Sequence, residues 1–116
     1  MNIRSATPED IPAILEMIQE LADYEKEPDA VENTPEMLNA TLFGENPRAF
    51  AEIIEEDRPV GIAIWFLNYS TWTGKHGLYL EDLYVKQEVR GKGYGKQMLI
   101  HLANKAVTNG WSRFEW

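Results

Sequence analysis

The loop that follows an apolar segment at 78–85 carries glycines at three alternate positions, Gly91, Gly93 and Gly95. Glycine has no Cβ, so the chain can adopt left-handed dihedral angles there and an anion can approach the main chain closely. A helix is expected to open directly after the loop, and its first turn adds unpaired N–H groups and the positive end of its dipole. This arrangement predicts a binding site for a pyrophosphate group on main-chain amides. A tight strand-to-helix turn without a ligand also selects glycine, and this alternative stays open.

Basic side chains gather in the same loop, at Arg90, Lys92 and Lys96. The pattern differs from two common phosphate loops. A P-loop requires Gly-Lys-Ser/Thr, but Gln97 follows Lys96 here, and a dinucleotide fingerprint requires glycine where this chain has Lys96. What remains is the motif Arg-x-x-Gly-x-Gly, which runs from Arg90 to Gly95.

Two adjacent acids, Glu81 and Asp82, lie inside the apolar segment before the loop. Strict strand alternation predicts two faces, with Tyr79, Glu81, Leu83 and Val85 on one and Leu80, Asp82 and Tyr84 on the other. At least one acid therefore has apolar neighbours. An unpaired buried carboxylate is costly, so it must be paired, hydrated or raised in pKa. A partner lysine or arginine elsewhere in the fold is the purely structural alternative for both acids.

Hydrophobic periodicity predicts an alternating order of strands and helices around these residues. Thr7 and Asp10 are both candidate N-caps of the first helix, and Pro12 favours Asp10 because proline is tolerated only in the first turn. The expected strands are 2–6, 49–55, 60–69, 78–85 and 111–116, and the expected helices run from Asp10 to about 25, from 33 or 34, and from the glycine loop to Gly110. The fold class is α/β (α+β), a mixed sheet flanked by helices in the order β-α-α-β-β-β-α-β, antiparallel at first and parallel across the last helix.

Composition limits the classes of function. The 116 residues, 44% hydrophobic and 26% charged, predict one globular domain over 1–116. The chain has no cysteine, no run of eighteen apolar residues and no apolar signal core, so we expect no disulfide, no membrane partner and, by default, a cytoplasmic location.

Charge is divided unevenly along the chain. Residues 1–60 hold 15 Asp or Glu and 4 Lys or Arg, a net charge of −11, whereas residues 61–116 hold 4 and 7, a net charge of +3. An acidic first half suits a cationic small molecule and the basic loop suits a polyanion. No basic stripe extends along the chain, so we expect no nucleic-acid partner.

The Arg90–Gly95 motif directly after an apolar strand resembles the acyl-CoA pyrophosphate loop of the GNAT superfamily of N-acetyltransferases, whose fold has the same order of elements. Within the superfamily the chain is most similar to diamine acetyltransferases and their thialysine N-ε-acetyltransferase relatives. The stretches that carry this similarity are ELADYE at 20–25, NYSTWTGK at 68–75 and YLEDLYV at 79–85. Ser70-Thr71-Trp72 lacks the acid that polyamine enzymes of this type have before the tryptophan, and it looks more like the thialysine relatives.

The resemblance implies acetyl-CoA as co-substrate, no metal, a small-molecule amine as acceptor and a homodimer. The implied coenzyme-binding residues are Leu83, Tyr84 and Val85 along the pantetheine arm and Arg90, Gly91, Lys92, Gly93, Tyr94, Gly95 and Lys96 around the pyrophosphate. The implied acceptor-binding residues are Tyr24, Glu25 and Glu81. Further candidates are Asp82, next to Glu81, and Trp72, whose ring can stack on an aliphatic amine or form a cation–π contact.

Acid–base chemistry gives a separate reason to examine Glu81. Acetyl transfer from a thioester needs a neutral amine, but an alkylammonium group has a pKa of about 10, so a base must accept its proton. A carboxylate beside the thioester can do this, and we expect Glu81 to be the catalytic residue. His76 and His101 have no metal-ligand spacing, His101 falls on the polar side of its helix, and neither is assigned a role.

Family members continue beyond the position that matches Trp116, with a helix that carries a tyrosine thought to protonate the leaving thiolate. We therefore expect this chain to be a partial GNAT domain that binds acetyl-CoA weakly and turns over poorly. Two hypotheses follow. The chain is an acetyl-CoA-dependent N-acetyltransferase for a small primary amine, or it is an inert module that binds acyl-CoA or dimerises.

Overall fold

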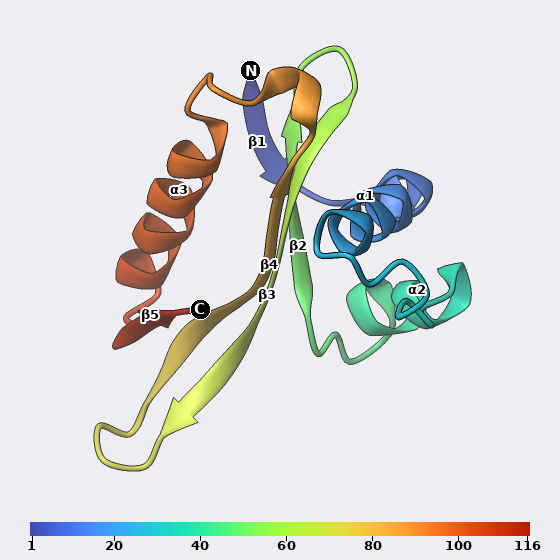
Figure 1. Cartoon of the computed structure of the whole chain (residues 1–116). Coiled ribbons are helices and arrows are strands. Elements are labelled where there is room, and N and C mark those ends of the chain that lie inside the picture. Colours follow the sequence, from blue (N-terminus) through green and yellow to red (C-terminus); the bar gives the residue numbers. More distant parts are fainter.

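A five-stranded sheet in the order β1-β2-β3-β4-β5 lies at the centre of the molecule, with helices on both faces (Figure 1). The computed structural model describes all residues from 1 to 116. The strands are β1 (Asn2–Ser5), β2 (Phe50–Glu55), β3 (Pro59–Ser70), β4 (Lys75–Val85) and β5 (Arg113–Glu115), and the helices are α1 (Ile11–Tyr24), α2 (Pro35–Phe43) and α3 (Tyr94–Thr108). This confirms the predicted order, and none of the helices is long and apolar enough to cross a membrane.

The first four strands pair antiparallel with their neighbours, and β5 pairs parallel with β4, as predicted for a connection through a helix. The parallel pairing covers only Gly77–Tyr79 of β4, although β4 continues to Val85. Residues 80–85 therefore carry main-chain N–H and C=O groups that pair with no strand on the β5 side.

Each face of the sheet has its own hydrophobic core. Helices α1 and α2 cover one face and α3 covers the other (Figure 1). On the α1 and α2 side, Ile14 and Met17 pack against Ile53 and Ile62. On the α3 side, Met98 and Leu102 pack against Ile54 and Leu78. Strand β3 contributes to both cores, which agrees with its predicted central place.

The helix ends follow local chemistry. A 3-10 turn at Pro8–Asp10 has Thr7 as its N-cap, and α1 continues from Asp10, so both predicted cap residues are used. At α2, the Thr34 hydroxyl accepts a hydrogen bond from the Met37 N–H at 3.1 Å. At the end of α3, Gly110 has φ +73°, and the Trp111 and Gly110 N–H groups donate to the Ala106 and Val107 carbonyls. This Schellman motif ends the helix where Gly110 predicted.

Strict alternation along β4 was the wrong expectation. Trp65 of β3 pairs with Leu80 and Ile64 pairs with Asp82, so Glu81 is an extra residue in a β-bulge. Because of the extra residue, side chains before the bulge share a face with those an odd number of positions further along β4. Leu80 therefore lies with Leu83 and Val85 in the α3-side core, whereas Tyr84 lies in the α1-side core.

Candidate functional site

Two of the three loop glycines have the left-handed backbone that the sequence predicts, whereas Gly95 lies in the first turn of α3. Gly91 has φ +88° and Gly93 has φ +81°, both in the left-handed region, and a Cβ at either position would meet no atom within 4 Å. The main chain of the loop therefore borders open space. Gly93 is the N-cap of α3 and has no side chain to bond the first-turn N–H groups. A hollow of about 420 Å³ lies here, lined by Val85, Val89, Arg90, Gly91, Gly93, Tyr94 and Gly95. Its left-handed glycines and the uncapped N–H groups at the start of α3 fit a pyrophosphate.

An acidic residue that the sequence analysis did not identify lies beside the glycine loop. Glu56, in the turn between β2 and β3, accepts hydrogen bonds from the Tyr94 hydroxyl and from the Lys92 ammonium, the latter at 3.3 Å. These contacts, the Tyr94 bond first, hold the pKa of Glu56 below its ordinary value. The same bond to Glu56 raises the pKa of Tyr94. Lys92 is thus partly neutralised, whereas Lys96 forms no ion pair in the structure.

Arg90 folds back onto the sheet instead of pointing freely into solvent. Its Nε donates to the Val85 carbonyl at 3.0 Å. Its guanidinium carbon lies 5.1 Å from the centre of the Tyr24 ring and 5.5 Å from that of Tyr84. These distances are typical of cation–π contacts. Arg90 therefore joins the glycine loop to the ends of β4 and α1.

A buried lysine forms a second link between β4 and α1. The Lys86 ammonium lies 2.8 Å from a Glu16 oxygen and 2.7 Å from a Glu20 oxygen. The Tyr84 hydroxyl donates to the other Glu20 oxygen at 2.8 Å. Burial disfavours the charged lysine, but the bonds to Glu16 and Glu20 outweigh it and raise the pKa of Lys86. Burial, followed by the bond to Glu20, raises the pKa of Tyr84.

Three of the predicted acceptor-binding residues, Glu25, Glu81 and Asp82, lie near one another on the α1 and α2 side of the sheet. Asp82 is half-buried, and burial raises its pKa, with the negative charges of Glu81 and Glu25 adding to the effect. No basic side chain offsets these effects. The structure therefore contains no ion pair that would explain Asp82 by stability alone. A hollow of about 260 Å³ opens beside these acids, lined by Ile18, Asn33, Leu38, Thr41, Leu42, Ala49, Ile64, Glu81 and Asp82.

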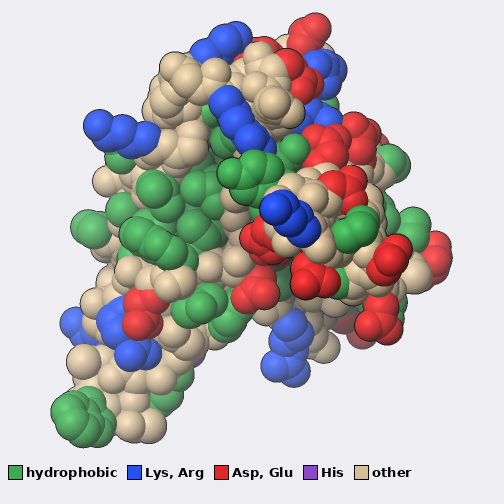
Figure 2. Space-filling model, in the orientation of Figure 1, with side chains coloured by type: hydrophobic (Ala, Val, Ile, Leu, Met, Phe, Trp, Pro, Cys, Tyr) green, Lys and Arg blue, Asp and Glu red, His purple; other side chains and the backbone are tan.

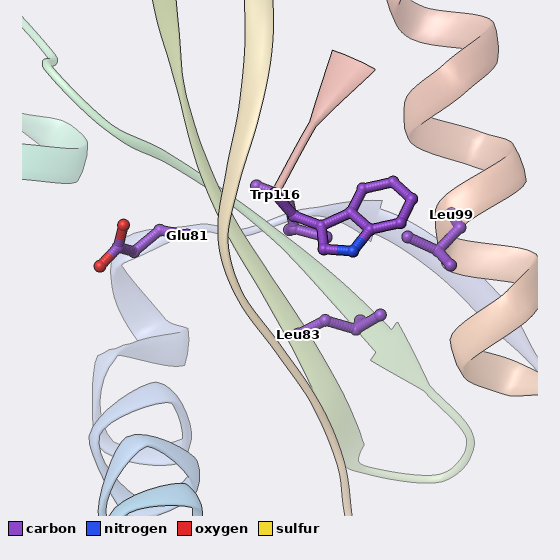
Figure 3. A pocket seen from close by; sticks show the side chains of 5 residues that line it. Glu81, Leu83, Leu99 and Trp116 are labelled. Atoms are coloured by element: carbon purple, nitrogen blue, oxygen red, sulfur yellow. The ribbon is translucent and has the colours of Figure 1, made fainter.

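A second hollow, of about 220 Å³, lies on the α3 side of β4 and is mainly apolar. Leu83 and Leu99 line it together with Leu80, Trp116 and Glu81. Figure 3 shows the Glu81 carboxylate extending to the opposite side of β4 from Leu83, Leu99 and Trp116. The bulge at Glu81 therefore separates an apolar hollow from an acidic one.

Other predicted residues lie apart from this arrangement. Trp72 is 97% exposed in the turn of the β3–β4 hairpin, which projects from the body of the molecule (Figure 1). Tyr24 lies against Arg90 rather than lining the hollow beside Asp82. His101, predicted on the polar side of its helix, has its Nε2 3.1 Å from the buried carboxylate of Glu52. No group of His, Cys, Asp or Glu could hold a metal ion.

Comparison with known proteins places this geometry in a family. The acetyltransferase (GNAT) family model matches residues 14–116. The chain is 43% identical to a thialysine N-ε-acetyltransferase of Sus scrofa over 122 residues, with 97% of this chain and 71% of that protein covered. It is 27% identical to an L-ornithine N5-acetyltransferase of Arabidopsis thaliana, with 99% and 71% covered.

Solved structures agree on the fold. The crystal structure of a probable acetyltransferase superposes with a TM-score of 0.86 at 20% identity, covering 98% of this chain and 77% of the other. An aminoglycoside acetyltransferase from a soil metagenome superposes with a TM-score of 0.80 at 15% identity, covering 99% and 76%. The family match over most of the chain and the similarity to the porcine protein lead to one conclusion: the chain belongs to the GNAT family of acetyltransferases.

Proposed function

We propose that this chain transfers the acetyl group of acetyl-CoA to a primary amine of a small molecule, a diamine, polyamine or lysine-like compound. One observation carries the proposal. The bulge at Glu81 lies between an acidic hollow and an apolar one, on the strand that leads to the glycine loop. A nucleophile and an acyl donor can therefore meet at β4 from opposite sides.

The coenzyme side is formed by main chain. Amides of the glycine loop and the first turn of α3 bind the pyrophosphate, which needs close approach and N–H donors. The pantetheine arm extends along β4, where Leu83, Tyr84 and Val85 have no partner strand on the β5 side. Leu83 and Leu99 in the apolar hollow contact its aliphatic part.

The acceptor side is formed by carboxylates. Glu25 and Asp82 attract the ammonium form of the amine, and Glu81 accepts its proton as the nitrogen attacks the thioester carbon. The new C–N bond forms, the C–S bond breaks, and the CoA thiolate leaves. The apolar lining at Ile18, Leu38 and Leu42 suits the aliphatic chain of such an acceptor.

The names of two relatives support an aliphatic amine as the acceptor. Thialysine and L-ornithine both carry an amine at the end of a side chain, and the names of the two relatives place acetylation there. The acceptor predicted from the resemblance is of the same kind, and the acidic hollow agrees with it in charge and shape.

Two measurements test the proposal. Calorimetry with acetyl-CoA measures coenzyme binding, and a thiol-release assay over spermidine, 1,3-diaminopropane, thialysine and L-ornithine measures transfer. We expect binding and turnover with at least one amine. Binding without turnover would favour the inert acyl-CoA-binding module, and no binding would refute both. Light scattering on the same sample tests the predicted homodimer.

A further inference from the structure

Arg90, Tyr24 and Tyr84 form a stack that spans the proposed coenzyme and acceptor sites. Arg90 comes directly before the glycine loop, Tyr84 lies in β4, and Tyr24 is the last residue of α1. The guanidinium lies within cation–π distance of both rings, at 5.1 Å and 5.5 Å. Arg90 also lines two hollows at once, the one over the glycine loop and one beside Glu20, Asp23 and Tyr24.

The two rings are held to different degrees. Tyr84 is buried, and its hydroxyl is fixed by Glu20, which Lys86 also binds. Tyr24 is 69% exposed and has no hydrogen bond through its hydroxyl. The contact with Arg90 therefore restrains a ring that is otherwise largely open to solvent.

Tyr24 matters because of the residue that follows it. Glu25 is the C-cap of α1, and its charge acts on Asp82 in the acidic hollow. A contact on the Tyr24 ring can therefore add to the hydrogen bond from the Glu25 N–H to the Leu21 carbonyl in holding Glu25 in place. The next residue, Lys26, has φ +63°, an unusual angle for a side chain other than glycine, so the helix stops abruptly there.

We propose that Arg90 is a positioning residue that couples the two sites through Tyr24, an inference that rests on the proposed function. A guanidinium has five N–H donors, and only Nε is used, by the Val85 carbonyl. The terminal nitrogens can donate to a phosphate over the glycine loop without breaking that bond or the stack. Bound coenzyme then fixes Arg90, Arg90 fixes the end of α1, and the amine binds more tightly. The coupling is reciprocal, so the amine strengthens coenzyme binding by the same factor.

The resemblance to diamine acetyltransferases implied a different role, in which Tyr24 contacts the amine itself. The two roles predict opposite behaviour for Tyr24→Phe. This variant keeps the ring that stacks on Arg90 and removes only the hydroxyl. If Tyr24 acts through Arg90, Tyr24→Phe resembles the wild type and Tyr24→Leu does not.

Calorimetry on the whole chain tests the coupling with thialysine and spermidine as probes, each measured with and without CoA, which cannot react. We expect CoA to tighten amine binding about two- to fivefold in the wild type and in Tyr24→Phe, the range of an exposed cation–π contact. Tyr24→Leu and Arg90→Lys should lose this factor, because one lacks the ring and the other lacks the planar fork. Tyr69→Leu, at the far end of the β3–β4 hairpin, is the matched control and should keep it. Coupling that survives in Tyr24→Leu, or disappears in Tyr24→Phe, would overturn the proposal.

Hydrogen exchange gives a readout that needs no turnover. The Glu25 and Glu27 amides donate to the Leu21 and Ala22 carbonyls at the end of α1. Their exchange should be faster in Tyr24→Leu than in Tyr24→Phe even without CoA, and CoA should slow it only when the ring is present. Equal rates in the two variants would refute the stack as a restraint. If the wild type binds no CoA at all, the proposed function fails, whereas binding without any effect on α1 refutes the coupling alone.

Discussion

At the scale of single residues, Asp82 is the side chain whose environment is least explained by folding. It is half-buried beside Glu81 and Glu25, and its pKa is raised by burial and by those two charges. A structure selected only for stability would have paired this carboxylate or replaced it. Residues with perturbed pKa values in a cleft are candidates for function, and we propose that an acceptor ammonium supplies the missing positive charge.

Replacing Asp82 with Asn should make the protein more stable and less able to bind its acceptor. Because the folded-state pKa of Asp82 is raised, its contribution to stability is present below the unfolded pKa and is lost as pH rises through the folded pKa. At pH 7 the ionised form is therefore a cost, and Asp82→Asn should raise Tm by a few degrees. Calorimetric melting at pH 4 and pH 7 checks this. A variant less stable than the wild type at pH 7 would show that Asp82 has a stabilising partner.

Glu81→Gln should lower kcat/KM about 100-fold or more, because the carboxamide cannot accept the proton of the attacking amine. The deficit should shrink as pH rises toward the amine pKa of about 10, where the neutral amine no longer needs a base. Initial rates from pH 7 to pH 10 measure the change. Glu45→Gln, an exposed acid in the turn after α2, is the control. An unchanged pH profile and unchanged acceptor affinity would remove Glu81 from the mechanism.

At the scale of elements, the glycine loop can be separated from ordinary turn glycines by comparing two substitutions. Gly93 and Gly74 have φ +81° and +69°, and a Cβ at either would meet no atom within 4 Å. Gly93→Ala and Gly74→Ala should therefore destabilise the protein similarly, by about 1 kcal/mol. Only Gly93→Ala should also weaken acetyl-CoA binding, by roughly tenfold. Chemical denaturation and calorimetry measure the two effects. Equal acetyl-CoA affinity in the two variants would contradict a phosphate site at the loop.

Lys86, which follows β4 and pairs with two acids of α1, should contribute to the free energy of unfolding. The pKa of Lys86 is raised, so its contribution to stability is present below the ordinary pKa range of lysine. It lasts as long as the Glu16 carboxylate, whose pKa the bond from Lys86 lowers, stays ionised. Lys86→Met removes the partner of Glu16 and Glu20, and we expect a loss of about 1–2 kcal/mol, limited because Glu16 is exposed. Urea unfolding measures it, with the exposed Lys75→Met as control. A loss no greater than that of the control would show that the two ion pairs contribute nothing.

The sequence predicted those elements and site features that depend on local chemistry. The order of strands and helices, the left-handed glycines of the loop and the end of α3 at Gly110 all follow from residues within a few positions of one another. The bulge at Glu81 could not be predicted, because it depends on how β3 and β4 pair. The same holds for the contact of Glu56 with Lys92 and for Lys86 with Glu16, which join residues 36 and 70 positions apart.

At the scale of the whole molecule, acidic side chains are concentrated over one part of the fold. Figure 2 shows acidic side chains gathered over α1 and α2, whereas basic side chains, with a few acidic ones among them, lie near the end of the molecule where Figure 1 places the glycine loop. The acidic residues that are concentrated in the first half of the sequence thus also lie together in the folded structure. Under the proposed function, the amine would meet acidic side chains and the coenzyme would meet the basic loop, although the net charge is −8.

The negative electrostatic field of the acidic side chains on α1 and α2 should make the rate of amine binding depend on salt concentration. Raising NaCl from 20 to 300 mM shortens the Debye length to below about 8 Å, so kcat/KM for an amine should fall roughly threefold or more. The fall should be steeper for spermidine than for a monoamine of similar length, because the attraction scales with the charge of the substrate. Acetyl-CoA binding should respond less, since the net negative charge opposes the local attraction of the loop. Stopped assays at constant pH measure the slopes, and equal slopes for the monoamine and spermidine would mean that α1 and α2 do not steer the acceptor.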